Sequence, residues 1–269
     1  MRGIAGDVLL SIAITSGEAR PAIADSKSIN RLLFGAWYEE DIYHQFCSRF
    51  PRAMRLFRGR IPRAMRARNL IFVHVPRVAG TSIVRALYGE GCIHHHSMHY
   101  YATLDPGFVE QAGSFALLRD PVARFASAFA FVRAGGTESS RLSDVFLRQT
   151  EGLVTVDDYL SFLEERGPLD LDFVMRPQSW FVCDHRGALL VKDIFLLGED
   201  GAALTAYLAP HGITRLPWLN HAPRSQLFLN PRQRRRIERL YADDFALIDS
   251  VRRQKCERNA TWAAKIAAE

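Results

Sequence analysis

The feature that most constrains the fold is an alternation of apolar runs and amphipathic helical stretches that begins near residue 69. Residues 70–75, LIFVHV, are typical of a buried strand, and residues 81–89, TSIVRALYG, have helical periodicity and end in glycine. Residues 114–120 (SFALLRD) and 121–133 (PVARFASAFAFVR) repeat the order of strand and helix. This alternation predicts an α/β fold in which helices cover both faces of a mostly parallel central sheet.

Later segments extend the pattern. Residues 155–166 predict a helix with a capping box between Thr155 and Asp158, and residues 193–200 predict a third strand that runs into the start of a helix. Residues 230–253 predict one long terminal helix, capped by Asn230 with a proline after it. Residues 135–141, GGTESSR, predict a loop.

Composition narrows the class of protein. The 269 residues carry a formal net charge of +6, which suits an anionic ligand. The four cysteines are widely spaced, so a zinc site or a disulfide framework is not expected, and reduced thiols in a cytoplasmic protein are the simplest interpretation. No apolar run is long enough to predict a transmembrane helix, and a cleaved signal peptide at the start is a minor alternative because Asp7 interrupts the apolar patch.

Residues 1–65 form an N-terminal extension that does not share the α/β pattern, and residues 256–269 are predicted to be a C-terminal tail. The motif PRAMR occurs twice, at Pro51 and Pro62. Two short amphipathic helical turns opened by proline are the first interpretation. The alternative is a basic surface that contacts an acidic polymer or a membrane face without crossing the membrane.

The stretch FVHVPRVAGTSI has the composition of an anion-binding loop. A helix N-terminus offers unpaired N–H groups and partial positive charge. Gly80 lets an anion approach the backbone, Thr81 and Ser82 offer hydroxyl groups, and Arg77, after Pro76, adds a forked cation. The sequence therefore predicts a phosphate- or sulfate-binding loop, with a plain capped turn as the alternative.

This loop is not a Walker A loop, which requires G-x-x-x-x-G-K-[ST]. Val75, directly before Pro76, stands at the position of the first glycine, and Thr81 stands at the position of the lysine. Asp120, at the end of the second predicted strand, is better explained as a helix N-cap than as a ligand of Mg²⁺. A phosphotransferase is therefore a less favoured alternative.

A second cationic position follows the second predicted strand. Arg119 lies at its carboxyl end, the edge where ligands bind in open α/β sheets. Ser127 lies about two helical turns further on, and Arg124 shares its helix face. Arg119 and Ser127 are predicted to hold a second anionic group, away from the first, so the ligand should carry phosphates at both ends.

These paired motifs, VPRVAGTS and LLRDPVARFASAF, resemble those of the sulfotransferases that depend on 3′-phosphoadenosine 5′-phosphosulfate (PAPS), and especially the carbohydrate sulfotransferase branch, which is sulfotransferase family 2-like. The resemblance covers about residues 69–253 and includes RPQSWFV, LPWLNHAPRS and IERLYADDFALI. It implies a P-loop-like domain over residues 66–255. It also implies transfer of the sulfuryl group of PAPS, the donor co-substrate, to a hydroxyl acceptor without a metal ion.

The resemblance also assigns roles to the two motifs. Arg77, Gly80, Thr81 and Ser82 take the 5′-phosphosulfate side, and Arg119 with Ser127 takes the 3′-phosphate. The family usually has lysine where this chain has Arg77, and that lysine is thought to stabilise charge on the leaving phosphate. Arginine also binds phosphate, so the chain is still expected to bind the donor. The effect of arginine on turnover is not predicted, and the alternative to an enzyme is a nucleotide-binding module with impaired catalysis.

Four histidines lie between the two motifs in CIHHHSMHYYATL. Sulfuryl transfer needs a base for the acceptor proton, and a neutral imidazole is available at pH 7. Related carbohydrate sulfotransferases place a histidine base in this region, and the candidates rank as His96, His99, His95 and then His94. A packed structural role is the alternative for each, and a metal cluster is disfavoured because no cysteine or carboxylate partner lies close by.

Later polar residues are weaker candidates. Arg224 is expected to help bind the donor's 3′-phosphate or the acceptor, with Asn220 and Ser225 as further candidates. A cationic helix face is predicted either to be solvated or to guide an acidic glycan; its members are Arg232, Arg235, Arg236 and Arg239. The acceptor is expected to be a glycan, with lipid-linked glycan, peptide tyrosine and small alcohol left open, and no nucleic acid is expected as a partner.

Overall fold

A computed structural model describes residues 50–54, 56, 61–89, 95–137, 140–142, 144–215 and 227–267. The expectations for residues 1–49 lie outside this part of the chain. So do those for His94, Asn220, Arg224 and Ser225.

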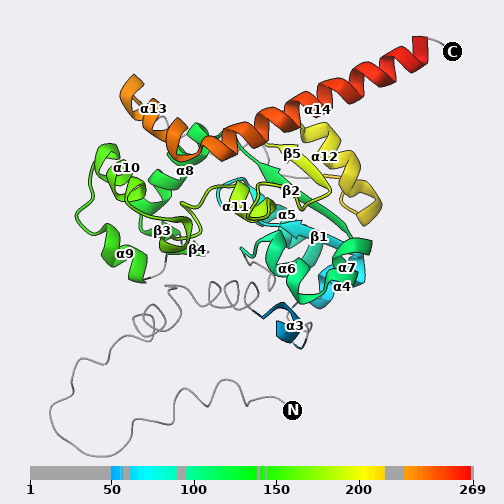
Figure 1. Ribbon diagram of the computed structural model, residues 1–269, viewed down its shortest axis with the longest axis horizontal. Helices are drawn as coiled ribbons and strands as arrows, with labels where there is room; N and C mark the ends of the chain where they lie inside the picture. The colour runs from blue at the N-terminus through cyan, green and yellow to red at the C-terminus, as the bar shows by residue number, and fades with distance from the viewer. Residues whose placement is uncertain are drawn as a thin grey trace, which may run out of the picture.

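The centre of the fold is a parallel sheet of three strands in the order β1-β2-β5 (Figure 1). The strands are β1 (Leu70–Val73), β2 (Gly113–Leu118) and β5 (Asp193–Leu196). Val73 pairs with Ala116, and Leu118 pairs with Leu196, so the strands end along one edge. The predicted α/β class with a parallel sheet flanked by helices is confirmed.

Helices connect the strands and cover the sheet (Figure 1). Between β1 and β2 lie α5 (Gly80–Tyr88), α6 (Met98–Leu104) and α7 (Pro106–Gln111). Between β2 and β5 lie α8 (Pro121–Arg133), α9 (Asp144–Thr150), α10 (Val156–Glu164), the 3₁₀ turn η3 (Pro168–Asp170) and α11 (Ser179–Val182). After β5 come α12 (Gly201–Leu208), η4 (Ala209–His211), α13 (Pro231–Leu240) and α14 (Ala242–Ala267). The segment predicted as a loop holds a short antiparallel pair, β3 (Gly136–Thr137) and β4 (Ser140–Arg141).

Two hydrophobic clusters form the core. The first surrounds the sheet and includes Phe72, Phe115 and Ile248, and the second lies among α8, α9, α10 and α13. α14 contacts both, because Tyr241 just before it and Phe245 pack in the second cluster while Ile248 packs in the first. Figure 1 shows α14 running past both groups of elements.

Local capping signals are confirmed. Asp120 accepts a hydrogen bond from the Ala123 amide at 2.8 Å and caps α8. Thr155 and Asp158 form the predicted capping box at the start of α10. These contacts span three residues, so the sequence alone specifies them.

The prediction of a single terminal helix over residues 230–253 is wrong. The helix breaks at Tyr241, whose φ of −115° and ψ of 31° separate α13 from α14. Tyr241 is buried, and its hydroxyl donates to the Met175 carbonyl at 2.9 Å. The break lets α13 face the second cluster while α14 reaches the first. α14 then continues to Ala267, across the predicted boundary at residue 255.

The two PRAMR motifs form the short helices expected of them. α3 (Pro51–Met54) begins at its proline, and α4 (Arg63–Arg68) begins directly after Pro62. Two α4 arginines bind the body of the protein, since Arg66 pairs with Asp105 at 2.9 Å and Arg68 donates to a backbone carbonyl. None of the helices in the described ranges combines the length and apolar character needed to cross a membrane.

Candidate anion-binding site

The loop between β1 and α5 has an unusual backbone. Arg77 and Ala79 have φ values of 68° and 63°, in the left-handed region that non-glycine residues seldom adopt. Ala79 is followed directly by the helical Gly80, which opens α5. Alternation of left- and right-handed residues turns successive N–H groups into one concavity that binds anions. Strain of this kind is characteristic of ligand-binding loops.

Gly80 is required by packing. A Cβ atom there would lie 2.8 Å from Nε2 of His74 and closer still to its Cδ2. The His74 ring is 4% exposed and lies near the rings of Phe72 and His95, with centroids at 5.8 and 4.3 Å. Burial, and then His95, lowers the pKa of His74 well below its usual value, so the ring is neutral. The sequence pattern suggested ligand approach as the reason for this glycine, and His74 supplies a second reason.

Three arginines meet beside this loop. Arg77 donates from Nε and Nη2 to Ser127 Oγ at 3.3 and 3.2 Å, and its guanidinium lies 4.4 Å from the centroid of Phe131. Arg119 Nη1 donates to the carbonyl of Arg77 at 3.4 Å. Arg124, which is buried, donates to the carbonyl of Pro76 at 3.1 Å. The two motifs, predicted to bind separate groups, thus form one cluster in which Arg77 contacts Ser127.

The arginine cluster, defined as Arg77, Arg119 and Arg124, concentrates positive charge. Burial, followed by Arg119 and Arg124, lowers the pKa of Arg77. Burial also lowers the pKa of Arg119 and of Arg124. Their side-chain hydrogen bonds go to carbonyl and hydroxyl oxygens, and within the described ranges none of the three forms an ion pair with a carboxylate. A bound anion would offset both the desolvation and the mutual repulsion.

A buried support fixes the strand end that carries Arg119. Gln178 accepts from the Arg119 amide at 2.9 Å and donates to the Arg119 carbonyl at 2.7 Å. The Asp244 carboxylate accepts from the amides of Gln178 and Ser179, each at 2.8 Å. Burial raises the pKa of Asp244, and Arg124 and these hydrogen bonds oppose that rise. The sequence interpretation assigned no role to Gln178 or Asp244.

The predicted histidines lie in different surroundings. His95 places Nδ1 2.9 Å from the carbonyl of His74, directly before the loop. His96 stacks on Tyr100, with ring centroids 4.1 Å apart. His99, in α6, interacts with His185, and burial and then His185 lower its pKa. His95 is thus bonded to His74, which directly follows β1 and leads into the loop.

The remaining predicted loop residues lie just before α5 and in its first turn. Thr81 and Ser82 occupy the first turn of α5 and are half-buried. Pro76 is buried, and its carbonyl accepts from Arg124. In the part of the chain that the structure describes, no group of His, Cys, Asp or Glu side chains has the arrangement of a metal site.

A cavity of about 590 Å³ lies elsewhere, between α14 and the segment around α11. Trp180, Cys183, His185 and Asp243 are among its lining residues, and no member of the arginine cluster is. Burial and nearby carboxylates raise the pKa of Cys183 to about 11, so its thiol stays protonated at neutral pH. The cavity is therefore not built around a reactive thiolate.

Comparison of the chain with protein-family models, curated proteins and solved structures found no match.

Proposed function

We propose that the chain transfers the sulfuryl group of PAPS to a hydroxyl acceptor, on a P-loop-like domain. The observation that carries the proposal is the arginine cluster beside the strained loop. Arg77 follows β1 and Arg119 follows β2, so both cations stand at the carboxyl ends of neighbouring parallel strands. A donor with a 3′-phosphate and a 5′-phosphosulfate carries the compensating charge.

The reaction is an in-line displacement at sulfur. The acceptor oxygen attacks sulfur while the bond from sulfur to the bridging 5′-phosphate oxygen breaks, which yields a sulfate ester and 3′,5′-ADP. Negative charge grows on the departing phosphate, so the loop N–H groups and Arg77 contribute most in the transition state. Arg119 binds the opposite end of the donor and contributes to affinity.

The acceptor proton passes to a histidine, and the geometry favours His95 over the sequence-ranked His96. A carbonyl oxygen only accepts, so the bond to His74 requires the proton on Nδ1 of His95. The neutral ring then carries its lone pair on Nε2, which is the arrangement that a general base needs. His96 instead stacks against Tyr100.

The second candidate is a nucleotide-binding module without turnover. The contact of Arg77 with Ser127 and Phe131 favours it, because that contact holds the guanidinium against α8. Arginine also presents a planar fork where the sulfotransferases have a compact ammonium.

Calorimetry with 3′,5′-ADP, 5′-AMP and ATP separates these functions. Under sulfuryl transfer, Arg119→Ala should weaken 3′,5′-ADP binding about 10- to 100-fold, since a charged hydrogen bond contributes about 1.5–3 kcal/mol. Its effect on 5′-AMP should stay within about threefold, on the same scale. Arg186→Ala, at an exposed position on another segment, is the matched control.

Equal affinity of the wild-type protein for 3′,5′-ADP and 5′-AMP would remove the role of Arg119, and tight binding of ATP that depends on Mg²⁺ would favour a phosphotransferase. An acceptor screen with labelled PAPS, read by mass, then distinguishes the enzyme from the binding module. Tight binding of 3′,5′-ADP without transfer to any hydroxyl compound supports the module.

A further inference from the structure

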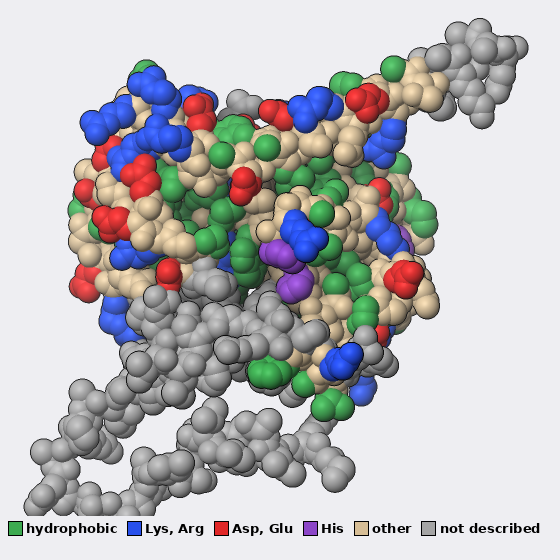
Figure 2. Space-filling model, in the orientation of Figure 1, with side chains coloured by type: hydrophobic (Ala, Val, Ile, Leu, Met, Phe, Trp, Pro, Cys, Tyr) green, Lys and Arg blue, Asp and Glu red, His purple; other side chains and the backbone are tan. Residues whose placement is uncertain are grey.

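α13 presents a dense group of exposed arginines. Its sequence is PRQRRRIERL, and Figure 2 shows the basic side chains gathered over this helix at one corner of the molecule. We define the arginine face as the exposed residues Arg232, Arg234, Arg235 and Arg239. Glu238 is the one acidic residue of the helix, so the surface carries a strong local excess of positive charge.

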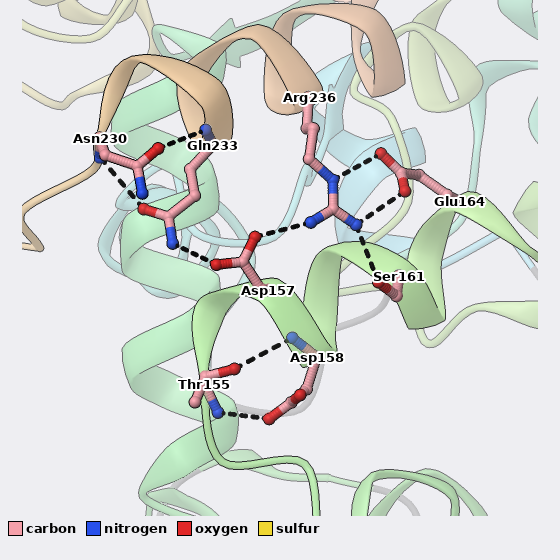
Figure 3. Close-up of polar contacts among 8 residues, drawn as sticks. All are labelled: Thr155, Asp157, Asp158, Ser161, Glu164, Asn230, Gln233 and Arg236. Atoms are coloured by element: carbon pink, nitrogen blue, oxygen red, sulfur yellow. Dashed lines mark hydrogen bonds and ion pairs between the residues drawn. The ribbon is translucent and has the colours of Figure 1, made fainter.

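Arg236 does not belong to this face, contrary to the sequence prediction. It is 8% exposed and binds α10 through both edges of its guanidinium (Figure 3). Nε and Nη2 donate to the Glu164 carboxylate at 2.9 and 2.8 Å, and Nη1 donates to Asp157 at 2.7 Å. These partners raise the pKa of Arg236, with the hydrogen bonds to Glu164 as the largest cause.

A second contact fixes the start of the helix. Gln233 closes the capping box with Asn230 and also donates to Asp157 at 2.8 Å (Figure 3). α13 is therefore held against α10 at Gln233 and Arg236, along one side. Arg232 and Arg239 lie one turn before and one turn after Arg236, so they flank the contact with α10, and their charges help to lower the pKa of Glu164. Arg234 and Arg235 turn away from that side.

The chemistry of the arginine face fits a polyanion. Four guanidinium groups lie within about two helical turns, a span of about 10 Å. Each fork matches a carboxylate or sulfate group. α13 has no aromatic residue, so it lacks the stacking platform with which proteins hold single-stranded nucleic acid.

We propose that the arginine face of α13 docks a polyanionic glycan, a chain with carboxylate or sulfate groups, as an extended part of the acceptor. This inference rests on the proposed sulfuryl transfer for its choice of glycan. α13 packs against α8, the helix that carries Arg124 and Ser127. A chain bound along α13 therefore lies next to α8, the helix that carries Arg124 of the arginine cluster.

The test compares two quadruple variants of the full chain with equal loss of charge. The first replaces each residue of the arginine face by glutamine. The second replaces four exposed arginines elsewhere by glutamine, namely Arg63, Arg186, Arg253 and Arg258. The probe is a heparin octasaccharide, followed by calorimetry at fixed salt, with a neutral octasaccharide and a 12-base-pair DNA duplex as comparisons.

The face variant should bind heparin octasaccharide about 30-fold more weakly, since four exposed ion pairs contribute about two- to threefold each. The control variant should stay within about fivefold, because it retains the face and loses only long-range attraction. Both should keep the thermal midpoint and the 3′,5′-ADP affinity of the wild-type protein, which shows that folding and the donor site are intact.

Several results would overturn the proposal: no binding of heparin by the wild-type protein, unchanged binding by the face variant, or an equal loss in both variants. Tighter binding of the DNA duplex through the same four residues would replace the glycan by nucleic acid. Failure of the sulfuryl-transfer proposal can be distinguished from failure of the glycan proposal. In the first case PAPS is not turned over, but heparin binding still depends on the arginine face of α13.

Discussion

Replacement of Gly80 by alanine tests the link between loop packing and ligand binding. Gly80 is the first residue of α5, and its φ is not in the left-handed region, so alanine fits the backbone. The obstacle is the ring of His74, which a new Cβ would approach within 2.8 Å at Nε2. His74 is buried beside Phe72 and His95 and has no open side into which to move.

Overpacking of a core by one methyl group costs about 1–3 kcal/mol. Because the blocking atoms belong to a rigid ring rather than a flexible chain end, we expect about 2–3 kcal/mol for Gly80→Ala. At 2–4 °C per kcal/mol, this lowers the thermal midpoint by about 5–10 °C. Gly201→Ala is the matched control, since Gly201 also opens a helix and a Cβ there meets nothing within 4 Å.

The assay is a double-mutant cycle followed by urea unfolding, with His74→Ala as the second change. Removal of the ring should reduce the cost of Gly80→Ala to below about 0.5 kcal/mol, a coupling of about 2 kcal/mol. Equal costs in both backgrounds would refute the packing argument. If the double variant is folded but has lost 3′,5′-ADP binding, the glycine serves ligand approach, as the sequence pattern suggested.

Three further outcomes are expected. His95→Asn should lower turnover of PAPS at least 100-fold while 3′,5′-ADP affinity changes little, whereas His96→Phe should cost less than about tenfold; the reverse order would restore His96 as the base. Hydrogen bonds from Arg236 lower the pKa of Glu164 in the folded protein. At pH values above the ordinary pKa of about 4.3, the ionised Glu164 therefore stabilises the folded state. This stabilisation is lost as the pH falls through the lower pKa that Glu164 has in the folded state. Urea titrations should therefore show that wild type and Glu164→Gln differ at pH 7 and converge below about pH 4, and a difference that grew on acidification would contradict the pair. Asp244→Ala leaves the buried amide of Gln178 and the half-buried amide of Ser179 without their acceptor, so it should cost about 3 kcal/mol in unfolding free energy. Asp243→Ala, at the exposed neighbouring position, should be near neutral.

Sequence patterns located what is determined locally. The strands, the Asp120 cap and the Thr155 capping box depend on residues a few positions apart, and each forms where the pattern indicates. The pattern also predicted that Arg77 and Arg119 lie at one edge of the sheet, because the carboxyl ends of parallel strands share an edge. Their direct contact was not predicted.

The missed features depend on contacts between distant parts of the chain. The break at Tyr241 follows from its bond to Met175, and the support of Arg119 depends on Asp244. Neither partner can be identified from spacing along the chain. Similarly, an arginine repeat on α13 cannot show that Arg236 faces inward, because its acidic partners lie on α10.

The contacts of Gln178 and Asp244 that support Arg119 also determine when the candidate anion-binding site can form during synthesis of the chain. Gln178 holds the strand tip, and Gln178 is in turn held by a carboxylate of α14, a helix that follows both motifs along the chain. A nascent chain that ends before Asp244 has β1, β2 and all three arginines, but it lacks the carboxylate that holds Gln178 against the end of β2. Under the proposed function, binding of the donor should therefore appear only after synthesis has passed Asp244.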